Sequence, residues 1–295
     1  MGRGPALTPA GAPAGASGDG RALPVDRDPP VDRDPPVDRD PPVDRDPRRI
    51  AAMFGGIAPR YDLMNRLMTG GRDGHWRRLA ARAAAPAPGD RVLDACCGTG
   101  DLSFALADEC PGCEVVGLDF TAGMLERARG KAAARRRRGL PAPTFVRGDL
   151  LDLPFADGGF AAVTVGWGVR NVRDVPRAFA EMRRVTRPGG RVVCLESMQA
   201  PEGAGKRFHR VWMGRVVPLL GRLVTGDATA YAYLPASVEA FPRAQELAAI
   251  MAAAGLRRVR YRRFGFGAVA IHVGEAPAAP AAGEAPAAPA AGVAR

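Results

Sequence analysis

Residues 92–101 read VLDACCGTGD, and this stretch decides how the fold begins. A short apolar run ends at the carboxylate of Asp94, and Gly98 and Gly100 follow within six residues of it. Glycine adopts backbone angles that other residues resist, so the chain can bend sharply here and approach a ligand closely. The composition after Asp101 is that of a helix. The stretch therefore predicts a strand, a tight turn that cradles a small molecule, and a helix.

A second carboxylate is expected beside this turn. Residues 115–119 read VVGLD, which predicts another apolar strand ending at Asp119. Asp119 lies about 20 residues beyond Gly100, a separation at which an acid in such folds accepts hydrogen bonds from ribose hydroxyls. The turn and Asp119 together predict a site for a nucleoside-containing cofactor.

Two cofactor classes fit a turn of this kind, and the charge at its end separates them. Nicotinamide dinucleotides require G-x-G-x-x-G, whereas residues 98–103 read GTGDLS. Asp101 would repel a diphosphate, but the sulfonium and ammonium cations of S-adenosylmethionine tolerate Asp94 and Asp101. We therefore expect S-adenosylmethionine, held by Asp94, Gly98, Gly100 and Asp119.

A third strand is expected to end near Asp149 and Leu150. Asp149 is placed to bind the adenine amino group, while Leu150 packs on the ring. The alternative for Asp149 is a solvated loop acid without a ligand.

Apolar runs alternate with helical stretches through the middle of the chain, which favours a parallel sheet with helices on both faces. The expected strands are residues 91–95, 114–118, 144–146, 161–166 and 191–196, and the expected helices are residues 101–108, 122–138 and 175–186. Residues 256–264 and 267–273 flank a glycine-containing turn and predict an antiparallel hairpin. The predicted fold is α/β: a Rossmann-like, doubly wound, mostly parallel sheet with a terminal hairpin, the outline of a class I methyltransferase.

Both ends of the chain differ in composition from its middle. Residues 25–47 repeat VDRDPP, and residues 274–291 repeat GEAPAAPAA. Repeated prolines oppose helix and sheet, and the segments hold too few large apolar groups to offset chain entropy. We predict disordered tails at residues 1–49 and 276–295, around one domain of residues 50–275.

Charge and cysteine content set further limits. The net charge is +11, but Lys131 and Lys206 are the only lysines, so the excess rests on an unusually high arginine content. No apolar run approaches the 20 or so residues of a membrane-spanning helix. The five cysteines favour a reduced cytoplasmic protein. Cys110 and Cys113 predict a turn rather than a metal site, since no second ligand pair accompanies them.

Several further motifs are specific to one family. They are MFGGIAPRYDLMN at 53–65, GVRNV at 168–172, RPGGR at 187–191 and DATAYAYLPAS at 227–237. Together they resemble the ubiquinone/menaquinone biosynthesis C-methyltransferase family. The chain departs from the general methyltransferase pattern at Cys96, where glycine is usual, and at Gly166, where some relatives have serine.

This resemblance implies C-methylation of a prenylated quinol by S-adenosylmethionine. It also implies that Thr99, Asp119, Asp149 and Leu150 contact the cofactor. We favour demethylmenaquinol as the substrate, because the N-terminus lacks the pattern of a mitochondrial precursor. The polyprenyl methoxybenzoquinol precursor of ubiquinone, or another small lipid or phenol, remains an alternative.

The acceptor carbon of a quinol becomes nucleophilic when a neighbouring hydroxyl loses its proton, and a phenol has a pKa near 10 by analogy with tyrosine. We expect Arg170, in the GVRNV motif, to stabilise the phenolate or to orient a water that accepts the proton, because a guanidinium stays protonated and offers fixed donors. The alternative is an ordinary salt bridge. His209, in an arginine-rich segment, and His272, in an apolar strand, are weaker candidates for the chemistry.

Two segments of the sequence bear on partners other than the quinol. Residues 211–224 are apolar with interspersed arginines and suit a prenyl tail or a membrane surface, or else a buried lid helix. A homo-oligomer is compatible with the sequence. The arginine run at 135–138 raises the alternative of an RNA-binding protein, but it lacks interleaved aromatic residues, so we expect no nucleic acid.

Overall fold

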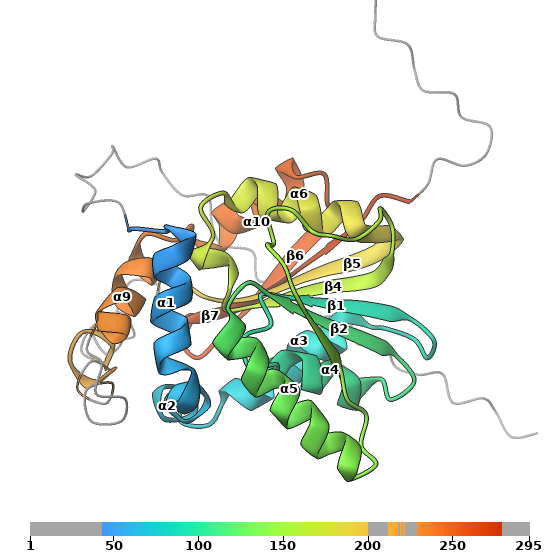
Figure 1. The fold of residues 1–295 in the computed structure, drawn as a ribbon. Coiled ribbons are helices and arrows are strands. Elements are labelled where there is room, and N and C mark those ends of the chain that lie inside the picture. Colours follow the sequence, from blue (N-terminus) through green and yellow to red (C-terminus); the bar gives the residue numbers. More distant parts are fainter. Residues whose placement is uncertain (1–42, 200–211, 218, 220, 222–228, 279–295) are drawn as a thin grey trace, which may run out of the picture.

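The computed structural model describes residues 43–199, 212–217, 219, 221 and 229–278. Seven strands form one sheet in the order β3-β2-β1-β4-β5-β7-β6 (Figure 1). The strands are β1 (Arg91–Ala95), β2 (Glu114–Asp119), β3 (Thr144–Arg147), β4 (Phe160–Gly166), β5 (Thr186–Ser197), β6 (Arg257–Phe264) and β7 (Val269–Glu275). The first five pair in parallel, whereas β7 lies antiparallel to both β5 and β6. The predicted sheet with a terminal hairpin is confirmed.

Helices cover both faces of this sheet. They are α1 (Pro47–Ile57), α2 (Tyr61–Thr69), α3 (Asp73–Ala84), α4 (Asp101–Glu109), α5 (Ala122–Arg137), α6 (Val175–Val185), α9 (Thr229–Glu239) and α10 (Ala244–Ala253), with short helices η1 (Ala58–Arg60), η2 (Val169–Asn171) and η3 (Trp212–Val216). Figure 1 shows α6 and α10 on one side of the sheet and α3, α4 and α5 on the other. Each layer buries its apolar stripe against the strands, with Phe179 and Met251 in one core and Leu102 and Leu106 in the other.

The helices before the sheet are not among the elements expected from the sequence. Helix α1 begins at Pro47, slightly before the predicted domain start at residue 50, and Asp46 caps it by accepting hydrogen bonds from the Arg48 and Arg49 amides. Figure 1 shows α1, α2 and α9 together at one edge of the molecule. Of the tails predicted to be disordered, residues 1–49 and 276–295, the structure describes only residues 43–49 and 276–278. Residues 1–42 and 279–295 lie outside the described residues, and their disorder stays a prediction.

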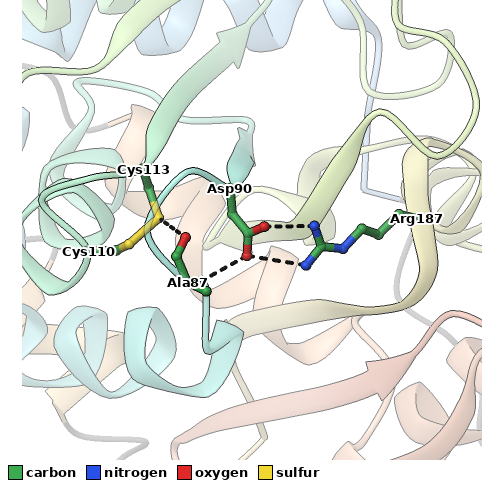
Figure 2. Close-up of a disulfide and its surroundings, with 5 residues drawn as sticks. All are labelled: Ala87, Asp90, Cys110, Cys113 and Arg187. Atoms are coloured by element: carbon green, nitrogen blue, oxygen red, sulfur yellow. Dashed lines mark hydrogen bonds and ion pairs between the residues drawn. A yellow bond between two sulfur atoms is a disulfide. The ribbon is translucent and has the colours of Figure 1, made fainter.

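Cys110 and Cys113 occupy the turn between α4 and β2, as predicted, but they are joined in a disulfide (Figure 2). This corrects the expectation that all cysteines are reduced. Cys113 Sγ lies 3.1 Å from the Ala87 carbonyl oxygen. Ala87 lies in the loop between α3 and β1, and this loop also contains Asp90. Asp90 accepts a 2.9 Å hydrogen bond from the Ala87 amide and pairs with Arg187 at 2.7 Å. The disulfide therefore lies where the loops leading into β1, β2 and β5 meet.

Neither a membrane-spanning helix nor a metal-binding cluster is present among the described residues. Among their helices, none combines the length and apolar character that crossing a bilayer requires. The same residues contain no group of three or more histidine, cysteine or acidic side chains that could hold a metal ion.

Candidate active site

A cavity opens where the parallel strands β1 and β2 end, with about 700 Å³ of empty space including its mouth. Its wall includes four of the residues predicted to hold the cofactor: Asp94, Gly98, Thr99 and Asp119. Strand ends and the loops after them are the usual ligand site of open α/β sheets, because neighbouring strands diverge there. We refer to this space as the first cavity.

Asp119 is fixed by the turn that precedes α4. One carboxylate oxygen accepts the Gly98 amide at 2.8 Å, and the other accepts the Thr121 amide at 2.8 Å. Burial raises the pKa of Asp119 even though these donors oppose the rise. Both oxygens keep further lone pairs, so the carboxylate can accept ribose hydroxyls from within the first cavity.

Asp94 is fully buried at the end of β1. The Ser103 hydroxyl donates to it at 2.6 Å and the Thr164 hydroxyl at 3.1 Å. Burial raises its pKa to about 7, against the effect of these donors. A carboxyl group that titrates near neutrality in a cavity wall responds strongly to a nearby cation.

The departure at Cys96 is accommodated by the backbone. Cys96 has a φ of +53°, a left-handed conformation that glycine adopts more easily than other residues. A Cβ atom on Gly168 would lie only 2.4 Å from the Cys96 Cβ, so glycine is required opposite the cysteine. At Gly166, the other departure, an added Cβ would lie 3.0 Å from Leu102.

Thr99 connects the turn to a charged network that sequence reasoning missed. Its hydroxyl donates to Asp62 at 2.6 Å, and Lys131 bridges Asp62 at 2.9 Å and Asp101 at 2.5 Å. Burial opposes ionisation of Asp62, but the Thr99 hydrogen bond and Lys131 outweigh it and lower its pKa. Asp62 belongs to the MFGGIAPRYDLMN motif, which is specific to the family but does not by itself indicate what this acid does. The network ties α2 to α4 and α5 around the first cavity.

Three predicted cofactor residues are not part of this cavity wall. Gly100 has a φ of +86° at the start of α4, where a Cβ atom would lie 2.7 Å from the Phe145 ring. Asp149 is exposed and accepts the Leu151 amide at 2.9 Å, and Leu150 is buried. Gly100 therefore shapes the turn, and ligand contacts by Asp149 and Leu150 stay predictions.

A second cavity shares a wall with the first, formed by Phe54, Tyr61 and Trp167. It contains about 990 Å³ of empty space, its mouth included, and its lining is mainly apolar. Arg170, the predicted catalytic residue, lines this second cavity rather than the first. Two neighbouring cavities separated by aromatic side chains can hold a methyl donor and a methyl acceptor side by side.

Arg170 forms a buried ion pair with Glu196, with 2.7 Å between Nη1 and Oε1. Nη1 also donates to the Trp167 carbonyl at 2.7 Å, whereas the buried Nε has no hydrogen-bond partner. Burial alone would lower the pKa of Arg170, but Glu196 outweighs it and raises the pKa. The salt-bridge alternative is therefore correct as geometry, and Arg170 is also one of the residues that line the second cavity. Glu196 ends the apolar run at 191–196, a pattern that predicts a strand but indicates no role for the acid at its end.

His272, one of the two histidines considered for the chemistry, has a structural role. His272 is fully buried, 2.8 Å from the Ala244 carbonyl and stacked on Tyr261, and burial lowers its pKa to about 4. It is the packed histidine that the sequence predicted. His209 and six of the 14 residues at 211–224 lie outside the described residues, whereas residues 212–217, 219 and 221 are described. In the arginine run, Arg135 and Arg136 donate to the Pro141 and Pro143 carbonyls, which secures the end of α5.

Comparison with known proteins bears directly on these two cavities. Residues 43–276 match the sequence profile of the ubiE/COQ5 methyltransferase family. The chain belongs to this family. It is 51% identical to the demethylmenaquinone methyltransferase of Thermus thermophilus over 225 residues, 76% of this chain and 100% of that protein. It is 44% identical to the one of Deinococcus radiodurans, over 77% of this chain and 92% of that protein.

Solved structures agree on the fold. The putative methyltransferase of Haloferax volcanii, in complex with the Trm112 activator, matches with a TM-score of 0.54 at 20% identity, over 76% of this chain and 97% of that one. An S-adenosylmethionine-dependent methyltransferase of Thermotoga maritima matches with a TM-score of 0.50 at 17% identity, over 76% and 99%. The chain is therefore an S-adenosylmethionine-dependent methyltransferase with a class I fold.

Proposed function

We propose that this enzyme methylates a ring carbon of a prenylated quinol, with demethylmenaquinol as its substrate. The observation that carries the proposal is the shared aromatic wall between an acidic cavity and an apolar one. The printed names of the Thermus and Deinococcus relatives support the choice of quinol. The sequence resemblance points to the same reaction.

The first cavity suits S-adenosylmethionine in charge and in shape. Asp94 and Asp101 line it and complement the cationic amino and sulfonium groups, and Asp119 offers acceptors for the ribose. Gly98 and Thr99 hold the turn against the ligand, while Gly100 keeps the start of α4 close. When bound, the cofactor supplies an electrophilic methyl group. We keep Asp149 and Leu150 as proposed adenine contacts.

The second cavity suits the quinol ring. The Arg170 Nε–H is buried, lacks a partner and belongs to a residue that lines the cavity, so a substrate oxygen can accept it. A guanidinium at that place stabilises the phenolate form of a hydroxyl group, which raises electron density on the adjacent ring carbon. Arg170 therefore acts as an electrostatic stabiliser and not as a base. The aromatic wall then aligns that carbon with the first cavity.

An assay with two acceptors tests the proposal. The enzyme is incubated anaerobically with methyl-labelled S-adenosylmethionine and either demethylmenaquinol or a polyprenyl methoxybenzoquinol, and products are identified by mass spectrometry. We expect methylation of the naphthoquinol to exceed that of the benzoquinol. Preference for the benzoquinol would assign the enzyme to ubiquinone biosynthesis. The absence of a methylated product from either quinol would refute the proposed function.

We further propose that this enzyme is cytoplasmic and that it touches the inner face of the membrane through α2. Helix α2 lines the second cavity with Asn65 and Met68, while Leu63 and Leu67 on it are 52% and 40% exposed. Arg66 is exposed between these leucines. Exposed leucines with arginine suit an anionic lipid surface.

Sedimentation with vesicles tests this contact. We expect binding to vesicles that contain anionic phospholipid and weaker binding to neutral ones. Leu63→Ser with Leu67→Ser should reduce it, whereas Leu140→Ser, at a leucine 41% exposed beyond the end of α5, should not. Equal binding of both variants would contradict the assignment to α2.

A further inference from the structure

The second cavity holds a carboxylate that the reaction described above leaves without a role. Among the described residues that line this cavity, Asp73 is the one acidic side chain. It lies at the first position of α3 and is 4% exposed. An acid this deeply buried in a mainly apolar wall has lost most of its contact with water, and that loss requires compensation.

Part of the compensation comes from an ion pair. Asp73 Oδ2 pairs with Arg77 one turn later on α3, and both side chains are less than a tenth exposed. Arg77 lines the first cavity, lies 3.8 Å from Asp101 and packs 4.8 Å from the Trp167 ring centre. The pair therefore balances the charge of Asp73. It also places Asp73 in the wall of the second cavity and Arg77 in the wall of the first.

The other oxygen, Oδ1, is incompletely satisfied. The Thr69 hydroxyl lies 3.1 Å from it, but the same hydroxyl lies 2.7 Å from the Asn65 carbonyl. A threonine hydroxyl carries one proton, and the nearer carbonyl is the better acceptor for it. Oδ1 thus keeps acceptor capacity at the wall of the second cavity, and a ligand hydroxyl can supply the missing donor.

The two redox forms of the substrate class differ in this property. A quinol presents two hydroxyl groups, each of which can donate a hydrogen bond, whereas a quinone presents carbonyl oxygens that only accept. A carboxylate only accepts, while the hydroxyl groups of Tyr61, Thr69 and Ser197 in the same lining can donate or accept. Arg170 can donate to an oxygen in either form. Asp73 is therefore the residue in this wall that distinguishes the two forms.

We propose that Asp73 accepts a hydrogen bond from one quinol hydroxyl and so selects the reduced quinol over the oxidised quinone. The proposal rests on the proposed function for the identity of the ligand. A quinone bound in the same place would set a carbonyl oxygen against a buried carboxylate and leave both without a donor. Sites built to receive a hydroxyl reject analogues that lack it for this reason. Asp73 is thus a specificity-determining residue of the second cavity.

Binding measurements test the proposal without relying on turnover. Dissociation constants are measured for a short-tailed demethylmenaquinol, kept reduced anaerobically, and for the corresponding quinone. We expect the wild-type enzyme to prefer the quinol. Asp73→Asn should reduce this preference by roughly 10- to 100-fold, the size expected for one buried hydrogen bond. Most of the change should be tighter quinone binding, because the amide can donate to a carbonyl.

Two further variants exclude indirect effects. Asp73→Asn leaves Arg77 buried without its partner, so the double variant Asp73→Asn/Arg77→Gln removes both charges and is measured in parallel. Glu181→Gln removes a carboxylate from an ion pair on α6 that lines neither cavity, and it should leave the quinol-to-quinone ratio unchanged. Thermal unfolding establishes that each variant is folded.

The outcomes separate this inference from the proposed function. An unchanged ratio in both folded Asp73 variants would overturn the role of Asp73, even if the wild type methylates the quinol. Equal wild-type affinity for the two forms would overturn it as well. A wild type that selects the quinol through Asp73 but transfers no methyl group would instead refute the proposed function and retain the selection.

Discussion

Arg170 and Glu196 form an ion pair that is almost completely excluded from water, with side chains 6% and 0% exposed. The pair joins η2, at the end of β4, to the end of β5, and so fixes the guanidinium beside the aromatic wall of Tyr61 and Trp167. Because the Arg170 Nε–H remains without a partner, the pair positions the arginine without using all of its donors.

Replacing Arg170 should therefore affect turnover more than cofactor binding. For Arg170→Ala we expect kcat to fall about 100-fold, the usual loss when one stabilising donor is removed. The dissociation constant of S-adenosylmethionine, measured by calorimetry, should change little because Arg170 does not line the first cavity. Unchanged kcat would remove Arg170 from the mechanism.

Glu196→Ala should lower the free energy of unfolding. Removing one partner leaves a buried guanidinium without its counter-charge, which typically costs about 3–5 kcal/mol. We expect urea unfolding to show a loss of this order. Glu181→Ala is the matched control, because Glu181 pairs with Arg184 at 2.8 Å in a more exposed place. A loss no larger than that of the control would contradict the structural role of Glu196.

Asp94 should make cofactor binding dependent on pH. Its pKa is raised to about 7 by burial, so the carboxyl group is largely neutral at pH 6 and largely ionised at pH 8. A cationic ligand favours the ionised form, so affinity should rise with pH and level off above the pKa, changing about tenfold per unit well below it. Calorimetric titration from pH 5.5 to 8.5 measures this. The profile of Asp94→Asn should be flatter, and identical profiles would exclude Asp94 as the group.

Removing the Thr99–Asp62 hydrogen bond should weaken cofactor binding. Thr99→Val keeps the shape of the side chain but removes the donor to Asp62. Hydrogen bonds to charged groups contribute about 1.5–3 kcal/mol, so we expect the dissociation constant of S-adenosylmethionine to rise tenfold or more. Thr144→Val, at an exposed threonine on β3, is the control. An effect confined to Thr99→Val supports the network, whereas equal affinities would show that α2 is held by other contacts.

The Cys110–Cys113 disulfide predicts a redox-dependent stability. Alkylation of the denatured, unreduced protein should modify three cysteines, Cys96, Cys97 and Cys194, and leave two protected. Replacing Cys110 and Cys113 together by serine should lower stability by about 2 kcal/mol, since the closed loop is short. A reductant should lower the melting temperature of the wild type and not that of the double variant. Five alkylated cysteines would show that the bond is absent.

The strands and the cofactor turn were predictable because local patterns determine them. An apolar run that ends at Asp94 or Asp119 favours a buried parallel strand, and Gly98 and Gly100 adopt left-handed angles that the turn requires. The predicted strand at 91–95 matches β1, and the hairpin follows from the glycine-containing turn between residues 256–264 and 267–273. In these elements periodicity, turn chemistry and burial indicate the same structure.

The partners across the cavities were not predictable, because they come from residues far apart in the chain. Glu196 faces Arg170 only because β4 and β5 pair in parallel register, and Asp62 reaches Thr99 only because α2 packs beside the turn. Likewise, Asp73 in a segment with no expected element becomes a buried carboxylate once α3 covers the sheet. Local patterns state which residues end a strand, whereas desolvation and the pairing of buried charges depend on the packed whole.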